Sequence, residues 1–134
     1  MRMDGHKIAR LMLIQTGLSE VDVVMDTTDK ARNRYTVGNK TIYLKIPTYS
    51  LDTLSAMAKA IHEAGHAIQH KELYLPFMLK ILLDPLFKSK RLTRIVEWDA
   101  TNRALYWLLK SELVNSDDFQ SIKIILANCL KTYN

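Results

Sequence analysis

Apolar residues recur with the period of an α-helix in four stretches of the chain, and a different pattern fills the region between the first two stretches. The helical period of about 3.6 residues occurs in residues 5–16, 51–70, 92–113 and 119–131. Residues 21–25 predict a strand, and residues 35–37 and 41–46 predict a hairpin around Gly38-Asn39, because these segments are rich in β-branched and aromatic side chains. The chain is therefore predicted to be α+β, mostly α, with a short β-sheet or hairpin packed on the second helix and two further C-terminal helices.

Residues with capping side chains predict where the helices begin and end. Asp4 is the expected N-cap of the first helix, and Gly17 is its expected C-terminal stop. Ser50 or Asp52 is the expected N-cap of the second helix, and Ser116-Asp117-Asp118 is expected to cap the last one. The apolar members of the third helix are Ile95, Val96, Ala100, Ala104, Leu105, Leu108 and Leu109.

The composition is that of a folded soluble protein. No linker or repeat divides the 134 residues, so we expect a single domain over residues 1–134. The net charge of +5 favours contact with acidic surfaces. Nucleic acid is not an expected partner, because no recognised binding motif is present. The lone Cys129 excludes an internal disulfide and lies in an apolar run, which predicts a buried thiol.

Residues 73–87 form the most apolar segment of the chain. Pro76 and Pro85 bound a span of fewer than ten residues, whereas crossing a bilayer takes about 20 residues. We expect a short helix that caps the core, with peripheral membrane contact through Leu73 to Arg94 as the alternative, since this stretch ends in a basic cluster. The apolar run Leu11 to Ile14 is too short for a signal-peptide core. The expected location is cytoplasmic, with the inner face of the membrane as the alternative.

The second helix carries the sequence His62-Glu63-Ala64-Gly65-His66. Residues four apart share one face of a helix, so His62 and His66 can bind one metal ion with Glu63 beside them. This is the HExxH zinc signature, in which the metal holds a water and the glutamate takes its proton as general base. We predict one Zn²⁺ per chain. Gly65 destabilises a helix interior by about 1 kcal/mol relative to Ala, which predicts that the helix carrying the third ligand approaches closely.

Glu97 is the predicted third metal ligand. Small residues near it on the third helix would allow the close approach that Gly65 predicts; they are Ala100, Thr101 and Ala104. A site of two His and one Glu with an open position is a catalytic rather than a structural zinc geometry. The competing third ligand is His70, one turn beyond His66, but it would hold the metal against its own helix.

Several polar residues are candidates for supporting roles. Thr101 is predicted to hydrogen-bond a ligating His, and Asp99 is predicted to pair with Arg103 four residues on. Zinc peptidases commonly stabilise the developing oxyanion with a Tyr, His or Arg near the metal. His70, Arg103 and Tyr106 are the candidates, and the sequence does not choose between them.

The second arm of the hairpin is the predicted peptide-binding strand. A sheet edge beside the motif helix can hold an extended peptide by strand addition, with one carbonyl facing the metal. The alternative is a plain structural strand, because periodicity does not distinguish an edge from a centre. The residues concerned are Thr41, Ile42, Tyr43, Leu44, Lys45 and Ile46.

Five segments of this chain resemble the YugP-type neutral zinc metallopeptidase family of membrane-associated bacterial proteins. They follow one another in the order of the family and comprise residues 5–10, 17–21, 40–44, 62–70 and 96–105. The resemblance implies a small zincin-like domain with a gluzincin-like site, where His62, His66 and Glu97 bind zinc and Glu63 is the base. Members of the family that resemble this chain usually carry transmembrane segments before the strands and between the two motifs. Here the first is absent and the second is reduced to Leu73 to Phe87.

The sequence therefore predicts a zinc-dependent metalloendopeptidase that acts on a peptide or protein. One alternative is a regulator-cleaving peptidase of the ImmA/IrrE type, which shares the His-Glu-x-x-His helix and a later ligand Glu. The other is a non-catalytic, zinc-stabilised binding module at a membrane surface. Glu63 argues against the module, because a purely structural site needs no carboxylate beside its first ligand. The sequence carries no signal for oligomeric state.

Overall fold

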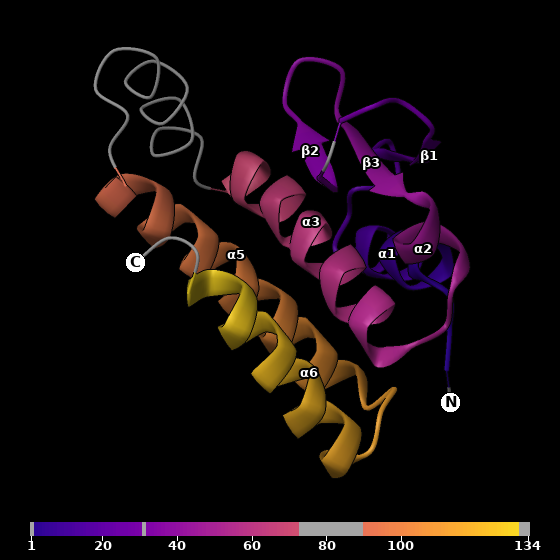
Figure 1. The fold of residues 1–134 in the computed structure, drawn as a ribbon, viewed down its shortest axis with the longest axis vertical. Coiled ribbons are helices and arrows are strands. Elements are labelled where there is room, and N and C mark those ends of the chain that lie inside the picture. Colours follow the sequence, from indigo (N-terminus) through magenta and orange to yellow (C-terminus); the bar gives the residue numbers. More distant parts are fainter. Residues whose placement is uncertain (1, 31, 73–89, 132–134) are drawn as a thin grey trace.

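Five helices and one three-stranded sheet form the described part of the chain (Figure 1). The structure is a computed structural model that describes residues 2–30, 32–72 and 90–131, the side chains of 90–92 excepted. The elements are α1 (Gly5–Gln15), β1 (Asp22–Asp26), β2 (Arg34–Thr36), β3 (Thr41–Lys45), α2 (Ile46–Ser50), α3 (Leu54–Glu72), α5 (Lys90–Ser111) and α6 (Ser116–Leu130). The predicted α+β, mostly α fold class is confirmed.

The sheet has the strand order β1-β3-β2. β1 pairs with β3 in parallel, and β2 pairs with β3 as the antiparallel hairpin that the sequence predicted. β3 is thus the central strand, and its backbone is hydrogen-bonded on both sides. The prediction that it binds a peptide by strand addition is wrong, because an added strand needs an unpaired edge. This correction applies to Thr41, Ile42, Tyr43, Leu44 and Lys45, and Ile46 lies in α2.

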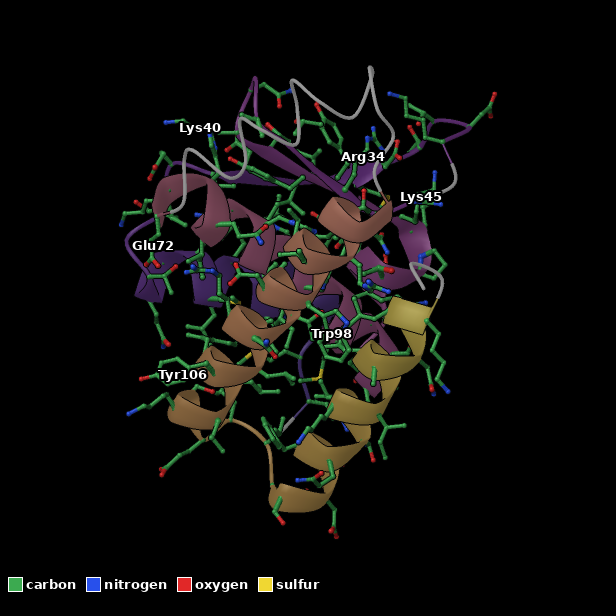
Figure 2. All side chains as sticks on the ribbon, turned by 90° about the vertical axis from the view of Figure 1, so that its left-hand side faces the viewer. Arg34, Lys40, Lys45, Glu72, Trp98 and Tyr106 are labelled. Carbon is green, nitrogen blue, oxygen red and sulfur yellow. The ribbon has the colours of Figure 1, made fainter. Side chains whose placement is uncertain are left out.

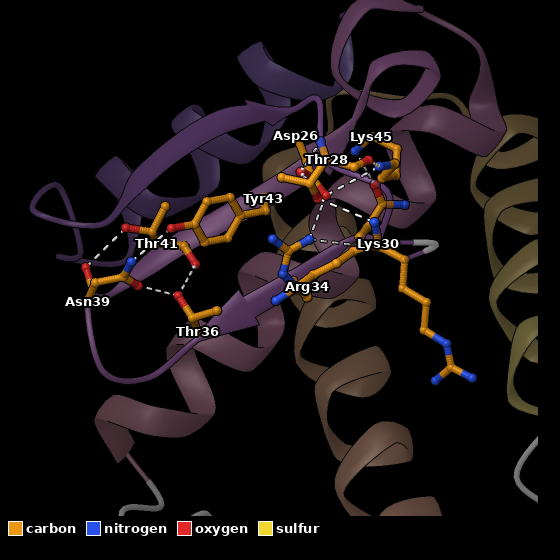
Figure 3. Close-up of polar contacts among 11 residues, drawn as sticks. Asp26, Thr28, Lys30, Arg34, Thr36, Asn39, Thr41, Tyr43 and Lys45 are labelled. Atoms are coloured by element: carbon orange, nitrogen blue, oxygen red, sulfur yellow. Dashed lines mark hydrogen bonds and ion pairs between the residues drawn. The ribbon is translucent and has the colours of Figure 1, made fainter.

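One buried carboxylate ties the three strands together (Figure 3). Asp26 ends β1, and its Oδ2 lies 2.6 Å from Nη1 of Arg34 in β2 and 3.4 Å from Nζ of Lys45 in β3. Its Oδ1 accepts hydrogen bonds from the backbone N–H and the hydroxyl of Thr28, at 3.0 and 2.7 Å. The bond from Arg34, together with those from Thr28 and Lys45, holds the pKa of Asp26 well below its usual range. We call these four residues the Asp26 cluster.

α3 is the central element of the fold. It packs against α1 and the sheet on one side and against α5 and α6 on the other (Figure 1). Its apolar residues, with Met57 and Ile61 fully buried, meet Ile8 and Met12 of α1 and Leu108 of α5 in one core. Most of its circumference is buried, so polar groups on α3 must find partners inside the protein.

The helix ends partly follow the predicted caps. Oδ1 of Asp4 accepts the N–H of Lys7 at 2.8 Å, and Gly17 has φ +78°, so both predicted boundaries of α1 are confirmed. α3 starts later than predicted, where Oγ1 of Thr53 accepts the N–H of Ala56 at 3.1 Å. α6 is capped by Asn115, whose Oδ1 accepts the N–H of Asp118 at 2.7 Å. The caps predicted at residues 50, 52 and 116–118 are therefore wrong.

Part of the chain with predicted membrane contact lies outside the described residues. The capping helix expected over residues 73–87 falls there, as does most of the stretch Leu73 to Arg94. Within the ranges that the structure describes, no helix combines the length and apolar character needed to cross a bilayer. Cys129 is exposed, so the predicted burial of its thiol is wrong.

Candidate metal centre

Three side chains from two helices converge on one point. Nε2 of His62 and Nε2 of His66, both on α3, each lie 2.8 Å from the same oxygen of Glu97 on α5, Oε2. The ligand atoms of the three residues all lie within 4.8 Å of one another. The two rings stand edge to face, with centroids 4.8 Å apart, so their nitrogens point to a shared centre from different directions. The convergence that the HExxH spacing and Glu97 predicted is present in the structure.

The two helices come close because α3 has a glycine at the crossing. A Cβ built on Gly65 would lie 2.3 Å from the backbone carbonyl oxygen of Ala100. Ala100, Thr101 and Ala104 of α5 are all buried against this contact. This matches the close approach predicted from Gly65, and it brings the Glu97 carboxylate within reach of the α3 imidazoles.

The other nitrogen of each imidazole also has a partner. Nδ1 of His62 lies 2.9 Å from Oγ1 of Thr101, where the sequence predicted a supporting hydrogen bond. Nδ1 of His66 lies 2.8 Å from Oε1 of Gln69. Sequence analysis missed Gln69. The available signal was its place three residues after a predicted ligand on the same helix, where side chains meet. Both rings are therefore oriented so that Nε2 faces the centre.

The electrostatics of the site favour positive charge at that centre. Burial lowers the pKa of His66, but the hydrogen bond with Glu97 and the negative charges of Glu63 and Glu97 outweigh burial and raise it to about 9. Burial raises the pKa of Glu97, but the hydrogen bonds from His62 and His66 hold it well below its usual range. Each group thus stabilises the charged form of the other.

Glu63 lies beside this centre on α3 and is buried. Within residues 2–30, 32–72 and 90–131, no hydrogen bond or ion pair satisfies its carboxylate. A buried carboxylate in that state calls for a partner that the described residues do not supply, such as a bound water. Two imidazole nitrogens and one carboxylate oxygen are also the donor set of catalytic zinc sites, so the residues present fit a zinc ion.

His70 does not join the metal-ligand group. Its Nδ1 lies 2.8 Å from the hydroxyl of Tyr35 in β2, so its ring is turned toward the sheet. Burial and the nearby charge of Lys40 lower the pKa of His70. Its predicted role as a competing third ligand is therefore not supported by the geometry.

The two other oxyanion candidates lie on α5. Arg103 donates from Nε to Asp99 at 2.7 Å, which confirms the predicted pair, and from Nη1 to Glu72 at 2.5 Å. Its guanidinium is thus engaged in two ion pairs. Tyr106 is 64% exposed on the outer surface of α5 (Figure 2). It follows Glu97 by nine residues, which is about 14 Å along a helix, so this candidate for oxyanion stabilisation lies away from the Glu97 carboxylate.

Comparison with known proteins also points to zinc. The family described as "Putative neutral zinc metallopeptidase" matches residues 1–96, which include both His ligands and Glu63 and end one residue before Glu97. A curated relative, "Putative membrane protease YugP" of Bacillus subtilis (strain 168), is 32% identical over 82 residues. That match covers 61% of this chain and 36% of the relative, so the chain spans little more than a third of that protein. No solved structure gives a significant match.

Proposed function

Because this chain belongs to the neutral zinc metallopeptidase family, we propose that it hydrolyses peptide bonds as a zinc-dependent endopeptidase. His62, His66 and Glu97 would hold the zinc ion. When bound, zinc polarises the scissile carbonyl and lowers the pKa of a water molecule to about 7. The observation that carries the proposal is the convergence of both Nε2 atoms on one Glu97 oxygen, 2.8 Å from each.

Glu63 is the proposed general base. Its carboxylate is buried beside the ligands and has no hydrogen-bonding partner among the described residues. It would take the proton of the attacking water and pass it to the leaving amine, which is the usual division of labour in an HExxH site. A non-catalytic zinc module would leave this buried carboxylate without a role, and for that reason we prefer the enzyme.

The peptide is proposed to lie along β2 rather than β3. In the described sheet β2 is an edge strand, and it packs against α3, whereas the other edge strand, β1, packs against α1 and α2. Tyr35 in the middle of β2 contacts His70, one turn beyond the second ligand. The Asp26 cluster holds Arg34 at the start of β2 (Figure 3). Strand addition at β2 would therefore place an extended peptide next to the metal ligands.

Metal analysis and peptide cleavage with a Glu63→Gln variant test the function. We expect one zinc per chain in both proteins, because Glu63 is not a ligand. Cleavage should fall by about 10²- to 10⁴-fold in the variant, the usual contribution of a general base. Glu72→Gln is the matched control, since Glu72 lies on the same helix but is exposed and pairs with Arg103. Parent-level cleavage by Glu63→Gln, or a parent chain that binds no zinc, would refute the proposal.

A further inference from the structure

Gln69 is a buried polar residue that neither the sequence motif nor the family match assigns to a role. It lies on α3, three residues after His66, and only 3% of its surface is exposed. Its side-chain oxygen Oε1 is 2.8 Å from Nδ1 of His66. The contact is therefore with the ring nitrogen that faces away from the metal centre.

Two contacts to α5 determine which way the Gln69 amide points. Its Nε2 donates to the backbone carbonyl of Val96 at 2.7 Å and to Oδ2 of Asp99 at 2.9 Å. Both partners are acceptors only, so the amide nitrogen must face them and the amide oxygen must face His66. An amide oxygen cannot donate. Nδ1 of His66 must therefore carry the proton in this bond.

Asp99 is itself held in place from α5. Its Oδ2 accepts from Nε of Arg103 at 2.7 Å, one helical turn further on. Arg103, Asp99, Gln69 and His66 thus form a continuous chain of hydrogen bonds from α5 to a ring on α3. Because each member has a defined donor or acceptor role, the chain transmits one proton arrangement to His66.

We propose that Gln69 is the positioning residue that sets the tautomer and ring orientation of His66. With the proton kept on Nδ1, Nε2 retains the lone pair that a metal ligand needs. Thr101 does not set the His62 ring in the same way, because a hydroxyl can either donate or accept. This inference rests on the proposed zinc site and adds that its affinity depends on a side chain that does not touch the metal.

A Gln69→Met variant tests the inference through zinc affinity, measured by competition with a fluorescent chelator. Methionine keeps the length of the side chain, but its sulfur accepts only weakly from His66 and it has no donor for α5. We expect the zinc dissociation constant to rise by about 10- to 100-fold, the usual effect of losing such a partner. Circular dichroism of the metal-free variant checks that it folds.

Gln15→Met is the matched control. Oε1 of Gln15 accepts a hydrogen bond from Nε1 of Trp107 at 3.0 Å, so this glutamine also bridges two helices, α1 and α5. Among the residues that the structure describes, no hydrogen bond joins Gln15 to a histidine. We expect this variant to bind zinc as tightly as the parent. The control therefore distinguishes the loss of an amide that bridges two helices from the loss of the hydrogen bond to His66.

A double variant, Gln69→Glu with Asp99→Asn, exchanges the amide and the carboxylate. The introduced glutamate can accept from Nδ1 of His66. The introduced asparagine can accept from Arg103 through its oxygen and, after turning, donate to that glutamate, whereas the Val96 carbonyl loses its donor. We expect zinc affinity within about tenfold of the parent and higher than that of Gln69→Met. A purely structural role for Gln69 predicts no such recovery.

Three results would overturn the inference: parent-like zinc affinity of Gln69→Met, an equal loss in Gln15→Met, or no recovery in the double variant. If Gln69→Met does not fold, the double variant decides alone. An affinity within about tenfold of the parent then supports the inference, and a weaker affinity overturns it. A parent chain that binds no zinc would refute the proposed function, whereas unchanged affinity in Gln69→Met would refute only this inference.

Discussion

Two carboxylates, buried Asp26 in the sheet and partly buried Glu97 on α5, both have pKa values well below the usual range, yet their surroundings differ. Asp26 faces the permanent cations of Arg34 and Lys45, and both of its oxygens accept hydrogen bonds. Glu97 faces two imidazoles, whose nitrogens can carry either a proton or a lone pair, and both contact a single oxygen.

This difference separates a structural carboxylate from a binding one. Arg34, Lys45 and Thr28 supply both the counter-charge and the hydrogen bonds of Asp26, so the cluster is complete without a ligand. The two imidazoles opposite Glu97 can offer lone pairs, and together with the Glu97 carboxylate they make three donors that attract a divalent cation. A low pKa therefore does not mark a functional site by itself, and the chemical type of the neighbours does. The comparison leads to the following predictions.

Glu97→Gln should have the largest effect on metal binding. It removes a direct ligand, so we expect zinc affinity to fall by more than about 100-fold, beyond the usual effect of an outer partner. Titration with a competing chelator measures this. Asp26→Asn is the matched control and should keep the zinc affinity of the parent. Equal zinc affinity in Glu97→Gln and the parent would contradict the assignment of the third ligand.

Asp26→Asn should destabilise the fold and leave zinc affinity unchanged. The variant leaves Arg34 and Lys45 at the junction of three strands without their shared counter-charge, and removing one partner of a buried pair is strongly destabilising. We expect a lower midpoint of thermal unfolding in the presence of a chelator. A midpoint equal to that of the parent would show that the Asp26 cluster does not hold the sheet together.

Gly65→Ala tests whether the close approach of α3 and α5 supports the metal site. The added Cβ would lie 2.3 Å from the Ala100 carbonyl oxygen, so the helices must separate. Overpacking usually destabilises by about 1–3 kcal/mol, against about 1 kcal/mol gained from the helix propensity of Ala. We expect a lower midpoint of thermal unfolding and weaker zinc binding. Gly38→Ala, with no atom within 4 Å of the added Cβ, should change neither.

The pH dependence of stability should distinguish the two carboxylate environments in the metal-free protein. The pKa of His66 is raised to about 9 in the folded state. The contribution of His66 to the free energy of unfolding is therefore complete below its unfolded pKa of about 6.5 and is lost as the pH rises through 9. The pKa of Asp26 is lowered in the folded state, so its contribution to the free energy of unfolding is complete above about pH 4 and is lost in acid.

Thermal unfolding in a chelator between pH 6 and 9 checks this prediction. The midpoint of the parent should fall across this range, and that of Asp26→Asn should fall in parallel from a lower start. In Glu97→Gln the fall should be smaller, because the carboxylate that stabilises charged His66 is gone. The same fall in Glu97→Gln as in the parent would contradict the proposed His66–Glu97 coupling.

The sequence predicted the metal centre better than its surroundings. The spacing of His62 and His66 on a helix and the small residues around Glu97 were sufficient, because helix geometry determines which side chains share a face. Gln69 could not be assigned, since its orientation depends on Val96 and Asp99 in a distant segment. The helical period of the apolar residues also did not predict which face of α5 is buried.

The failure on α5 concerns the apolar side chains. Ile95 and Leu109 were included among its apolar members, but they are 56% and 60% exposed, while Trp107 is buried. Apolar residues surround this helix, so the pattern alone does not identify the buried face. Contacts with α3 and α6 make that choice.

The sequence by itself determined the features that depend on short-range geometry: the helices, the hairpin, and the placement of two imidazoles and Glu63 on one turn. Only the tertiary structure decided that β3 is the central strand, that Gln69 rather than His70 lies beside His66, and that Tyr106 faces solvent. The physical reason is that strand order, helix rotation and amide orientation depend on contacts between segments far apart in the chain. Local spacing does not encode those contacts.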